Sequence, residues 1–341
     1  MLTETGSLEA FIDALPKVEL HVHLVGSASV PTVLELARRH PDGGVPLDER
    51  ELREFYTFTD FPHFAQVYDR VNHLVRTPED IATLVLGAAR DLAAQNVRYF
   101  ELTVTPQAHT RAGIPHHAVR EALDIAAREA RERYGVRVAY IYDIPADFGA
   151  EAVEGTLTAA LEHPAEALVG FGIGGVEQLR AAIRDEIRDA FRAARAAGLR
   201  SLPHAGEMTG PETMWEVIEH LGAERIGHGI ACVRDERLMA HLRDTGTPLE
   251  VCPTSNVCTG QIAALADHPL PRMLEAGLFV TLNTDDPPMF DTTLTGEYRL
   301  AAEVFGLGRA ELAALARNAV AASCLDDAGK EAIAAEIDAL G

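Results

Sequence analysis

The strongest constraint on the fold is the alternation of short β-rich runs with longer helical stretches along the 341 residues. Parallel strands need long crossover connections, so this alternation is typical of a parallel sheet whose strands are joined by helices. Eight runs have the apolar, β-branched composition of buried strands. They are residues 18–24, 97–104, 136–142, 168–171, 200–204, 225–228, 248–252 and 279–283. The pattern predicts an α/β fold, for which a (β/α)₈ TIM barrel is favoured over a doubly wound open sheet.

Two segments depart from the regular alternation. Residues 42–74 are rich in aromatic residues and proline, which predicts a helical insertion between the first helix and the second strand. Such insertions in barrels lie around the mouth of the active site. Residues 294–341 are alanine-rich and helical, which predicts the final barrel helix followed by extra C-terminal helices. Without a linker or repeat between these parts, we expect a single domain over residues 1–341.

Charge and composition exclude several classes of partner. The formal net charge of −22 repels nucleic acid and anionic membrane surfaces, so neither is an expected partner. No run approaches the roughly 18 apolar residues of a membrane span, and the first residues do not resemble a signal peptide. The cysteines show neither metal-ribbon spacing nor the density of a disulfide scaffold, so we expect a cytoplasmic protein. The oligomeric state stays open, and a homo-oligomer is compatible with the sequence.

Four residues at predicted strand ends have the chemistry of a metal site. His21 and His23 are two apart in a strand-like run, so both side chains point to the same face. A His-x-His pair alone is only moderately specific for a metal, and a structural role is favoured until other residues are considered. His204 closes the fifth predicted strand, and Asp285 follows the eighth. Barrel enzymes assemble their sites at these strand ends, and three imidazoles with one carboxylate suit zinc with one position left for water.

The succession of motifs resembles the adenosine deaminase family over nearly the full chain. The matching segments read HVHL at 21–24, HAGE at 204–207, GHG at 227–229, CPTSN at 252–256 and NTDDP at 283–287. The resemblance implies a (β/α)₈ barrel that holds one zinc ion per chain. The implied ligands are His21, His23, His204 and Asp285.

The resemblance also implies roles for the residues around a purine. Glu207 would donate a proton to purine N1, and His228 would activate and orient the attacking water. Asp286 would bind N7, and the backbone N–H of Gly175 would meet N3. Asp285 would be catalytic as well as metal-binding, and His23 would also lie beside the substrate.

Hydrolytic deamination of a purine requires a proton donor and a group that orients water, and these residue types can supply both. A carboxylic acid at N1 lets the ring accept electrons, and a dehydrated pocket favours the protonated form that Glu207 needs. A histidine beside the water can accept its proton or stabilise the hydroxide, so His228 is suited to either task. Related barrels with two metals often use a carboxylated lysine near the fourth strand. The only lysines here, Lys17 and Lys330, lie elsewhere, which favours a single metal.

Val25 departs from the family pattern. Adenosine deaminases usually have an aspartate at this position, which contacts the ribose 5′-hydroxyl. Valine cannot accept a hydrogen bond, and burying the hydroxyl against it would cost about 1–3 kcal/mol. The preferred substrate is therefore a 6-aminopurine nucleoside with carbon at the 5′ position, such as 6-amino-6-deoxyfutalosine of the futalosine route to menaquinone.

Several alternatives to this substrate remain open. Adenosine or another 5′-modified adenosine is the first, and free adenine follows. A metal-dependent phosphoesterase or a non-catalytic relative is favoured least, because the motifs supply no basic residues for phosphate and the chain has no export features.

The remaining histidines lack partner spacing and are interpreted as surface or structural residues. They are His40, His63, His73, His109, His116, His117, His163, His220, His241 and His268.

Overall fold

The computed structural model describes residues 2–58 and 61–340, with side chains from residue 8 onward except at position 61. Its strands are all parallel to their neighbours. They are β1 (Lys17–His23), β2 (Val97–Val104), β3 (Arg137–Pro145), β4 (Leu168–Gly174), β5 (Arg200–Ser201), β6 (His204–Ala205), β7 (Ile226–His228), β8 (Leu249–Val251) and β9 (Val280–Leu282). Each of the eight predicted runs overlaps a strand, and the fifth run is divided between β5 and β6.

The strands close into a barrel. Leu202 and Pro203 interrupt the fifth strand, yet Leu202 N donates to Phe171 O and Gly227 N donates to Pro203 O, so both neighbours stay joined to it. At the other seam, Asp285 N donates to His21 O at 2.9 Å, and His23 N donates to Asp285 O at 3.1 Å. These bonds connect the segment after β9 to β1, so the fold is a (β/α)₈ barrel rather than an open sheet.

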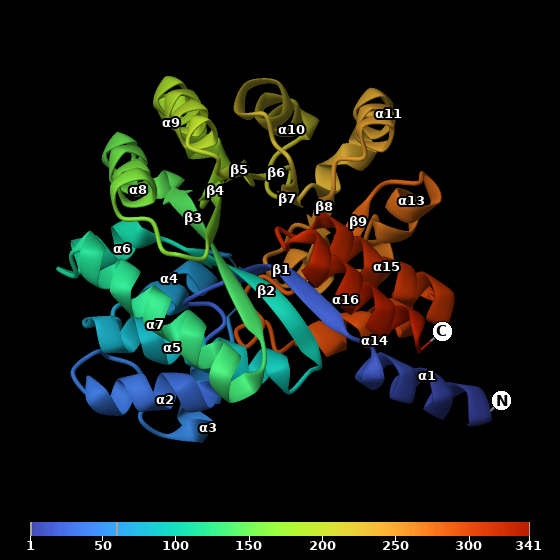
Figure 1. Ribbon diagram of the computed structural model, residues 1–341, viewed down its shortest axis with the longest axis horizontal. Coiled ribbons are helices and arrows are strands. Elements are labelled where there is room, and N and C mark those ends of the chain that lie inside the picture. The colour runs from blue at the N-terminus through green and yellow to red at the C-terminus, as the bar shows by residue number, and fades with distance from the viewer. Residues whose placement is uncertain (1, 59–60, 341) are drawn as a thin grey trace.

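Helices surround the strands (Figure 1). They are α1 (Leu2–Ala14), α2 (Val30–Arg39), α3 (Glu49–Phe55), α4 (Phe61–Asn72), α5 (Pro78–Ala93), α6 (Pro106–Arg111), α7 (His116–Tyr134), α8 (Ala150–Glu162), α9 (Arg184–Ala196), α10 (Pro211–Glu216), α11 (Glu236–Thr245), α12 (Pro253–Cys258), α13 (Leu270–Glu275), α14 (Leu294–Phe305), α15 (Arg309–Ala322) and α16 (Asp327–Asp338). Short helical turns are η1 (Ala146–Phe148), η2 (Glu177–Ile183), η3 (Val217–Leu221), η4 (Ile230–Arg234) and η5 (Leu265–Asp267).

The predicted insertion and C-terminal extension are both present. The insertion forms α3 and α4, and α15 packs on β1 and β9 at the seam of the barrel. Local sequence explains where α5 begins, because the Asp80 carboxylate accepts a hydrogen bond from Thr77 N at 2.9 Å, and Pro78 occupies the first helical turn. α1 packs on α14 and α15. Both ends of the chain lie on the same side of the barrel (Figure 1).

Polar side chains fill part of the barrel interior. In β1 the odd-numbered residues share one face, and Glu19 and His21 on that face are buried. Arg225, just before β7, bonds the carboxylates of Glu101 in β2 and Glu250 in β8, so the network crosses the barrel. Arg225 is 2% exposed, and this buried charge is stabilised because both carboxylates pair with it.

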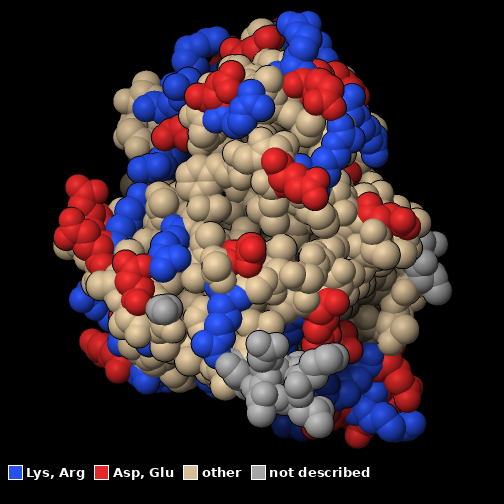
Figure 2. Space-filling view, turned by 90° about the vertical axis from the view of Figure 1, so that its right-hand side faces the viewer, with Lys and Arg blue, Asp and Glu red and all other residues tan. Residues whose placement is uncertain are grey.

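On the face shown in Figure 2, acidic and basic side chains are interspersed around a central area of mostly uncharged side chains. Among the described residues, no helix combines the length and the apolar character needed to cross a membrane.

Candidate active site

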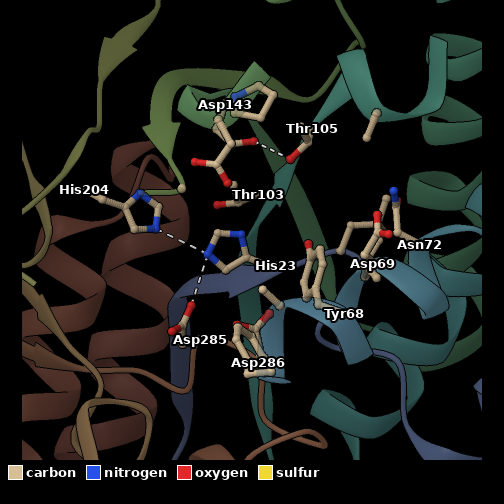
Figure 3. A pocket seen from close by; sticks show the side chains of 18 of the residues that line it. His23, Tyr68, Asp69, Asn72, Thr103, Thr105, Asp143, His204, Asp285 and Asp286 are labelled. Carbon is tan, nitrogen blue, oxygen red and sulfur yellow. Dashed lines mark hydrogen bonds and ion pairs between the residues drawn. The ribbon is translucent and has the colours of Figure 1, made fainter. Parts of the chain in front are cut away.

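The four predicted metal ligands converge at the carboxyl ends of the strands. His21 and His23 come from β1, His204 begins β6 and Asp285 follows β9. His23 Nε2 lies 3.1 Å from Asp285 Oδ1 and 3.3 Å from His204 Nε2, so His23 stands between these two side chains (Figure 3). His21 Nε2 lies 3.5 Å from the same Asp285 oxygen.

This arrangement suits a bound cation. The Nε2 atom of His21 is buried and has no hydrogen-bond partner, as expected of a nitrogen that faces a metal position. Burial lowers the pKa of His21, but the carboxylates of Asp285 and Glu250 outweigh burial and raise it to about 10. For His23, burial is likewise outweighed by Asp285 and Asp286, and the pKa rises to about 9. The site therefore stabilises positive charge where the donor atoms meet.

Buried partners orient the candidate ligands. Ser255 Oγ donates to Asp285 Oδ2 at 2.7 Å, and His21 Nδ1 lies 2.6 Å from Glu250 Oε2. The contact with Glu250 places the proton of a neutral His21 on Nδ1 and leaves Nε2 as a metal donor. The imidazoles of His21 and His23 beside Asp285 outweigh the effect of burial and hold the pKa of this carboxyl group well below its usual range.

A directional chain of hydrogen bonds fixes the tautomer of His228. Leu270 N donates to His268 Nδ1 at 3.1 Å, so the proton of a neutral His268 is on Nε2, 3.2 Å from Asn256 Oδ1. Asn256 Nδ2 then donates to His228 Nδ1 at 3.2 Å. Burial, together with nearby His21, lowers the pKa of His228 to about 3, so its ring is neutral. The remaining proton is on Nε2, 3.6 Å from Glu207 Oε2.

Glu207 is held by a carboxylate from another loop. Its backbone N donates to Glu177 Oε1 at 3.0 Å, and the Thr209 and Thr213 hydroxyls donate to Glu177 Oε2. Glu177 is 3% exposed and belongs to η2, two residues after Gly175. Burial, followed by the charges of Asp285 and Glu177, raises the pKa of Glu207 to about 8, which favours the protonated acid.

Asp286 lies against a glycine. A Cβ at Gly26 would lie 1.5 Å from Asp286 Oδ1, so only glycine permits the observed position of this carboxyl group. Asp286 Oδ1 is buried without a hydrogen-bond partner in the described structure. Burial and the charge of Asp285 raise the pKa of Asp286 to about 8. Asp286 is therefore able to act as a hydrogen-bond donor.

Backbone strain marks two of these positions. His228 (φ 59°) and Asp285 (φ 66°) are both in the left-handed region that non-glycine residues rarely adopt. Such conformations cost on the order of 1 kcal/mol or more and occur mainly where the surrounding structure fixes a side chain for function.

The site opens into a cavity of about 260 Å³. His23, Val25, His204, Glu207, His228, Asp285, Asp286 and Gly175 all line it, so the structure brings together every predicted site residue except His21, which is buried beneath. Phe64 and Tyr68 of α4 also line the cavity, which confirms that the insertion borders the mouth. Figure 3 shows Tyr68, Asp69 and Asn72 on the opposite side of the cavity from His204.

Some residues around the site were not found by sequence reasoning. Glu177 and Glu250 had no motif of their own. His268 is buried and satisfied, as the structural interpretation predicts, but it is also part of the chain that orients His228. His109 differs from that interpretation, because it is buried, lines the cavity and has an Nδ1 atom without a hydrogen-bond partner in the described structure. Burial lowers the pKa of His109 to about 4.

A closed parallel barrel with histidines and a carboxylate at the carboxyl ends of its strands is typical of metal-dependent hydrolases. Comparison with known proteins identifies the family. The family profile described as adenosine deaminase matches residues 16–340, and the chain belongs to the adenosine deaminase family. It is a hydrolytic deaminase.

Similar curated proteins cover nearly the same length. An aminodeoxyfutalosine deaminase of Streptomyces avermitilis is 50% identical over 338 residues, covering 98% of this chain and 94% of the relative. An adenine deaminase of Rhizobium leguminosarum bv. trifolii is 38% identical over 323 residues, covering 95% of this chain and 99% of the relative.

Solved structures share the fold. An adenine deaminase from Arthrobacter aurescens superposes with a TM-score of 0.88 at 31% identity, covering 95% of this chain and 98% of the other. An amidohydrolase from Burkholderia ambifaria with bound Zn gives a TM-score of 0.88 at 29% identity, covering 97% of this chain and 93% of the other.

Proposed function

We propose that this chain is a zinc-dependent hydrolase that converts aminodeoxyfutalosine to its 6-oxo product and ammonia, a step of the futalosine route to menaquinone. The identity of 50% to an aminodeoxyfutalosine deaminase, against 38% to an adenine deaminase, supports this substrate over free adenine.

The structural observation that carries the substrate assignment is the position of Val25. This side chain is 4% exposed and forms part of the cavity wall just after β1. A ribose 5′-hydroxyl against it would lose water without gaining an acceptor from that side chain, at a cost of about 1–3 kcal/mol. A 5′ carbon substituent makes apolar contact instead.

The donor set fits one zinc ion. His21, His23, His204 and Asp285 would hold it, because three imidazole nitrogens and one carboxylate oxygen suit zinc, which can take one further ligand for the reaction. Bound Zn in a solved relative with the same fold supports this metal. When bound, zinc supplies a Lewis acid that makes water nucleophilic at neutral pH.

The residues of this chain then complete the hydrolysis. Gly175 N–H and the protonated Asp286 hold the purine at N3 and N7, and the Nε2 proton of His228 orients the attacking water. The water oxygen bonds to C6 while Glu207 gives its proton to N1. The C6–N bond breaks and ammonia leaves with one water proton, while the other water proton restores the acid form of Glu207.

A substrate panel tests the proposal through ammonia release. We expect aminodeoxyfutalosine and 5′-deoxyadenosine to exceed adenosine at least about tenfold in kcat/KM, the factor that corresponds to about 1.4 kcal/mol of avoided desolvation. Val25→Asp should narrow or reverse this gap, with free adenine little affected. A wild-type preference for adenosine would instead make the chain an adenosine deaminase. A preference for free adenine would support adenine deamination, the activity named for the Arthrobacter aurescens structure.

Two further measurements test the zinc site and the acid. Elemental analysis should find one zinc per chain, and two tightly held metals, or full activity after chelation, would contradict the ligand assignment. Glu207→Gln should keep zinc and fold while lowering kcat at least about 100-fold, because an amide cannot deliver a proton to N1. Near wild-type kcat in this variant would remove Glu207 from its role.

A further inference from the structure

Acidic side chains outnumber basic ones in the lining of the cavity. Those that line it are Asp69, Asp143, Asp147, Glu207, Asp285 and Asp286, whereas no lysine or arginine of the described chain belongs to the lining. Aminodeoxyfutalosine carries an aromatic carboxylate at the end of its 5′ substituent. The ionised members of this lining repel the substrate carboxylate unless a cation lies at the place where the substituent ends.

Arg111 contacts the cavity wall through an aromatic ring. Its guanidinium carbon lies 4.4 Å from the centroid of the Phe148 ring, and Phe148 lines the cavity while being 39% exposed. Arg111 ends α6, whose residues Ala108 and His109 also line the cavity. In the described part of the chain no carboxylate pairs with Arg111. Stacking occupies the face of the guanidinium and leaves its in-plane N–H donors available for a carboxylate.

With Gly175 as the proposed partner of N3, Phe148 lies toward the edge of the purine that bears the sugar. The preceding residue, Asp147, is beside Gly175, since a Cβ at Gly175 would lie 2.8 Å from Asp147 Oδ1. Asp147 Oδ1 also accepts a hydrogen bond from Val176 N at 2.8 Å, which fixes η1 against this loop. Gly175 is the proposed partner of N3, which lies on the same edge of the purine as N9, the ring position that bears the sugar.

Two other arginines, Arg180 and Arg76, do not line this cavity. Arg180 donates to His204 O at 2.7 Å and lines a separate cavity behind the loop that carries Glu207. Arg76 pairs with Asp42 at 2.8 Å on the surface.

We propose that Arg111, stacked on Phe148 at the mouth of the cavity, binds the carboxylate of a nucleoside whose 5′ substituent ends in an aromatic acid. The identity of that nucleoside rests on the proposed function. Phe148 contacts the apolar part of the substituent, and Arg111 selects its charge.

The test compares substrates with and without the carboxylate. Arg111→Ala should lower kcat/KM for aminodeoxyfutalosine about tenfold, mainly through KM, which corresponds to about 1.4 kcal/mol for an exposed charge-assisted pair. Activity on 5′-deoxyadenosine should stay within about twofold. Arg111→Lys should give an intermediate loss, because lysine lacks the planar fork. Arg50→Ala, at an exposed arginine on α3, changes the net charge equally and should affect neither substrate.

Inhibition by the product separates this proposal from the proposed function. Futalosine, the 6-oxo product, keeps the carboxylate, and inosine lacks it. Both compounds are tested as competitive inhibitors of 5′-deoxyadenosine deamination. Arg111→Ala should raise the Ki of futalosine about tenfold and leave that of inosine unchanged. Tight futalosine binding without turnover of aminodeoxyfutalosine would contradict the proposed function and leave the Arg111 site supported. The Arg111 site is overturned if the variant loses both ligands equally, or if its futalosine binding is unchanged.

Discussion

Replacing His268 by phenylalanine should test whether remote hydrogen bonds set the proton position on His228. The phenyl ring keeps the volume of the 4% exposed side chain but removes the acceptor for Leu270 N and the donor to Asn256 Oδ1. Each buried group left unpaired costs about 1–3 kcal/mol, so a loss of roughly 2–6 kcal/mol in folding stability is expected if nothing rearranges.

The Asn256 amide can reduce this loss by rotating. Its oxygen would then face His228 Nδ1, which must carry the proton, and Nε2 would become an acceptor toward Glu207 and the reacting water. A misplaced imidazole proton can cost up to about 10⁴ in kcat in other hydrolases, and we expect at least about tenfold here with zinc content unchanged. The same substitution should therefore lower kcat far more than it raises KM.

Steady-state kinetics measure the change in kcat, and imidazole ¹⁵N NMR measures which nitrogen of His228 carries the proton. His268→Gln supplies both a donor and an acceptor and should restore most of kcat, whereas His220→Phe, at an exposed position, serves as the matched control. A folded His268→Phe enzyme with kcat within about twofold of wild type, or with the His228 proton still on Nε2, would refute the reasoning.

The pH dependence of folding stability tests independently whether His268 is buried in its neutral form. Burial lowers its pKa to about 4, below the value of about 6.5 for an unfolded chain. As the pH falls below about 6.5, the unfolded state takes up this proton first, so the stability contribution of His268 declines until about pH 4. The Tm of His268→Phe should depend less steeply on pH in this window than that of wild type. Equal slopes would show that His268 is not buried in its neutral form.

Substitutions at three other positions have defined outcomes. Glu177→Ala should lower kcat about 10- to 100-fold, because it releases the loop that carries Glu207. Glu177→Gln removes only the negative charge, which lowers the pKa of Glu207. This variant should chiefly move the alkaline limb of the pH–rate profile to lower pH. Glu250→Gln should weaken zinc binding about 10- to 100-fold in chelator titrations, and unchanged affinity would contradict its orienting role. Gly26→Ala should displace Asp286 and reduce kcat/KM at least about tenfold with zinc retained, and an unaffected enzyme would argue against the purine contact.

The sequence by itself determined the strand pattern and the residues at the centre of the site. Period-two and helical patterns are local, so each of the eight runs could be located from its own residues, and strand ends then placed His21, His204 and Asp285 at one edge. Val25 was also visible as a departure from the family motif, because a missing acceptor is a property of a single residue type.

Only the tertiary structure decided which distant side chains form hydrogen bonds with these residues. Barrel closure depends on the bonds between β1 and the segment around Asp285, which no local pattern contains. Glu177 and Glu250 are ordinary acidic residues until packing buries them against Glu207 N and His21 Nδ1. A buried polar group must find a partner, but the chain can bring that partner from anywhere, so the choice is made by three-dimensional packing and not by the sequence around each residue.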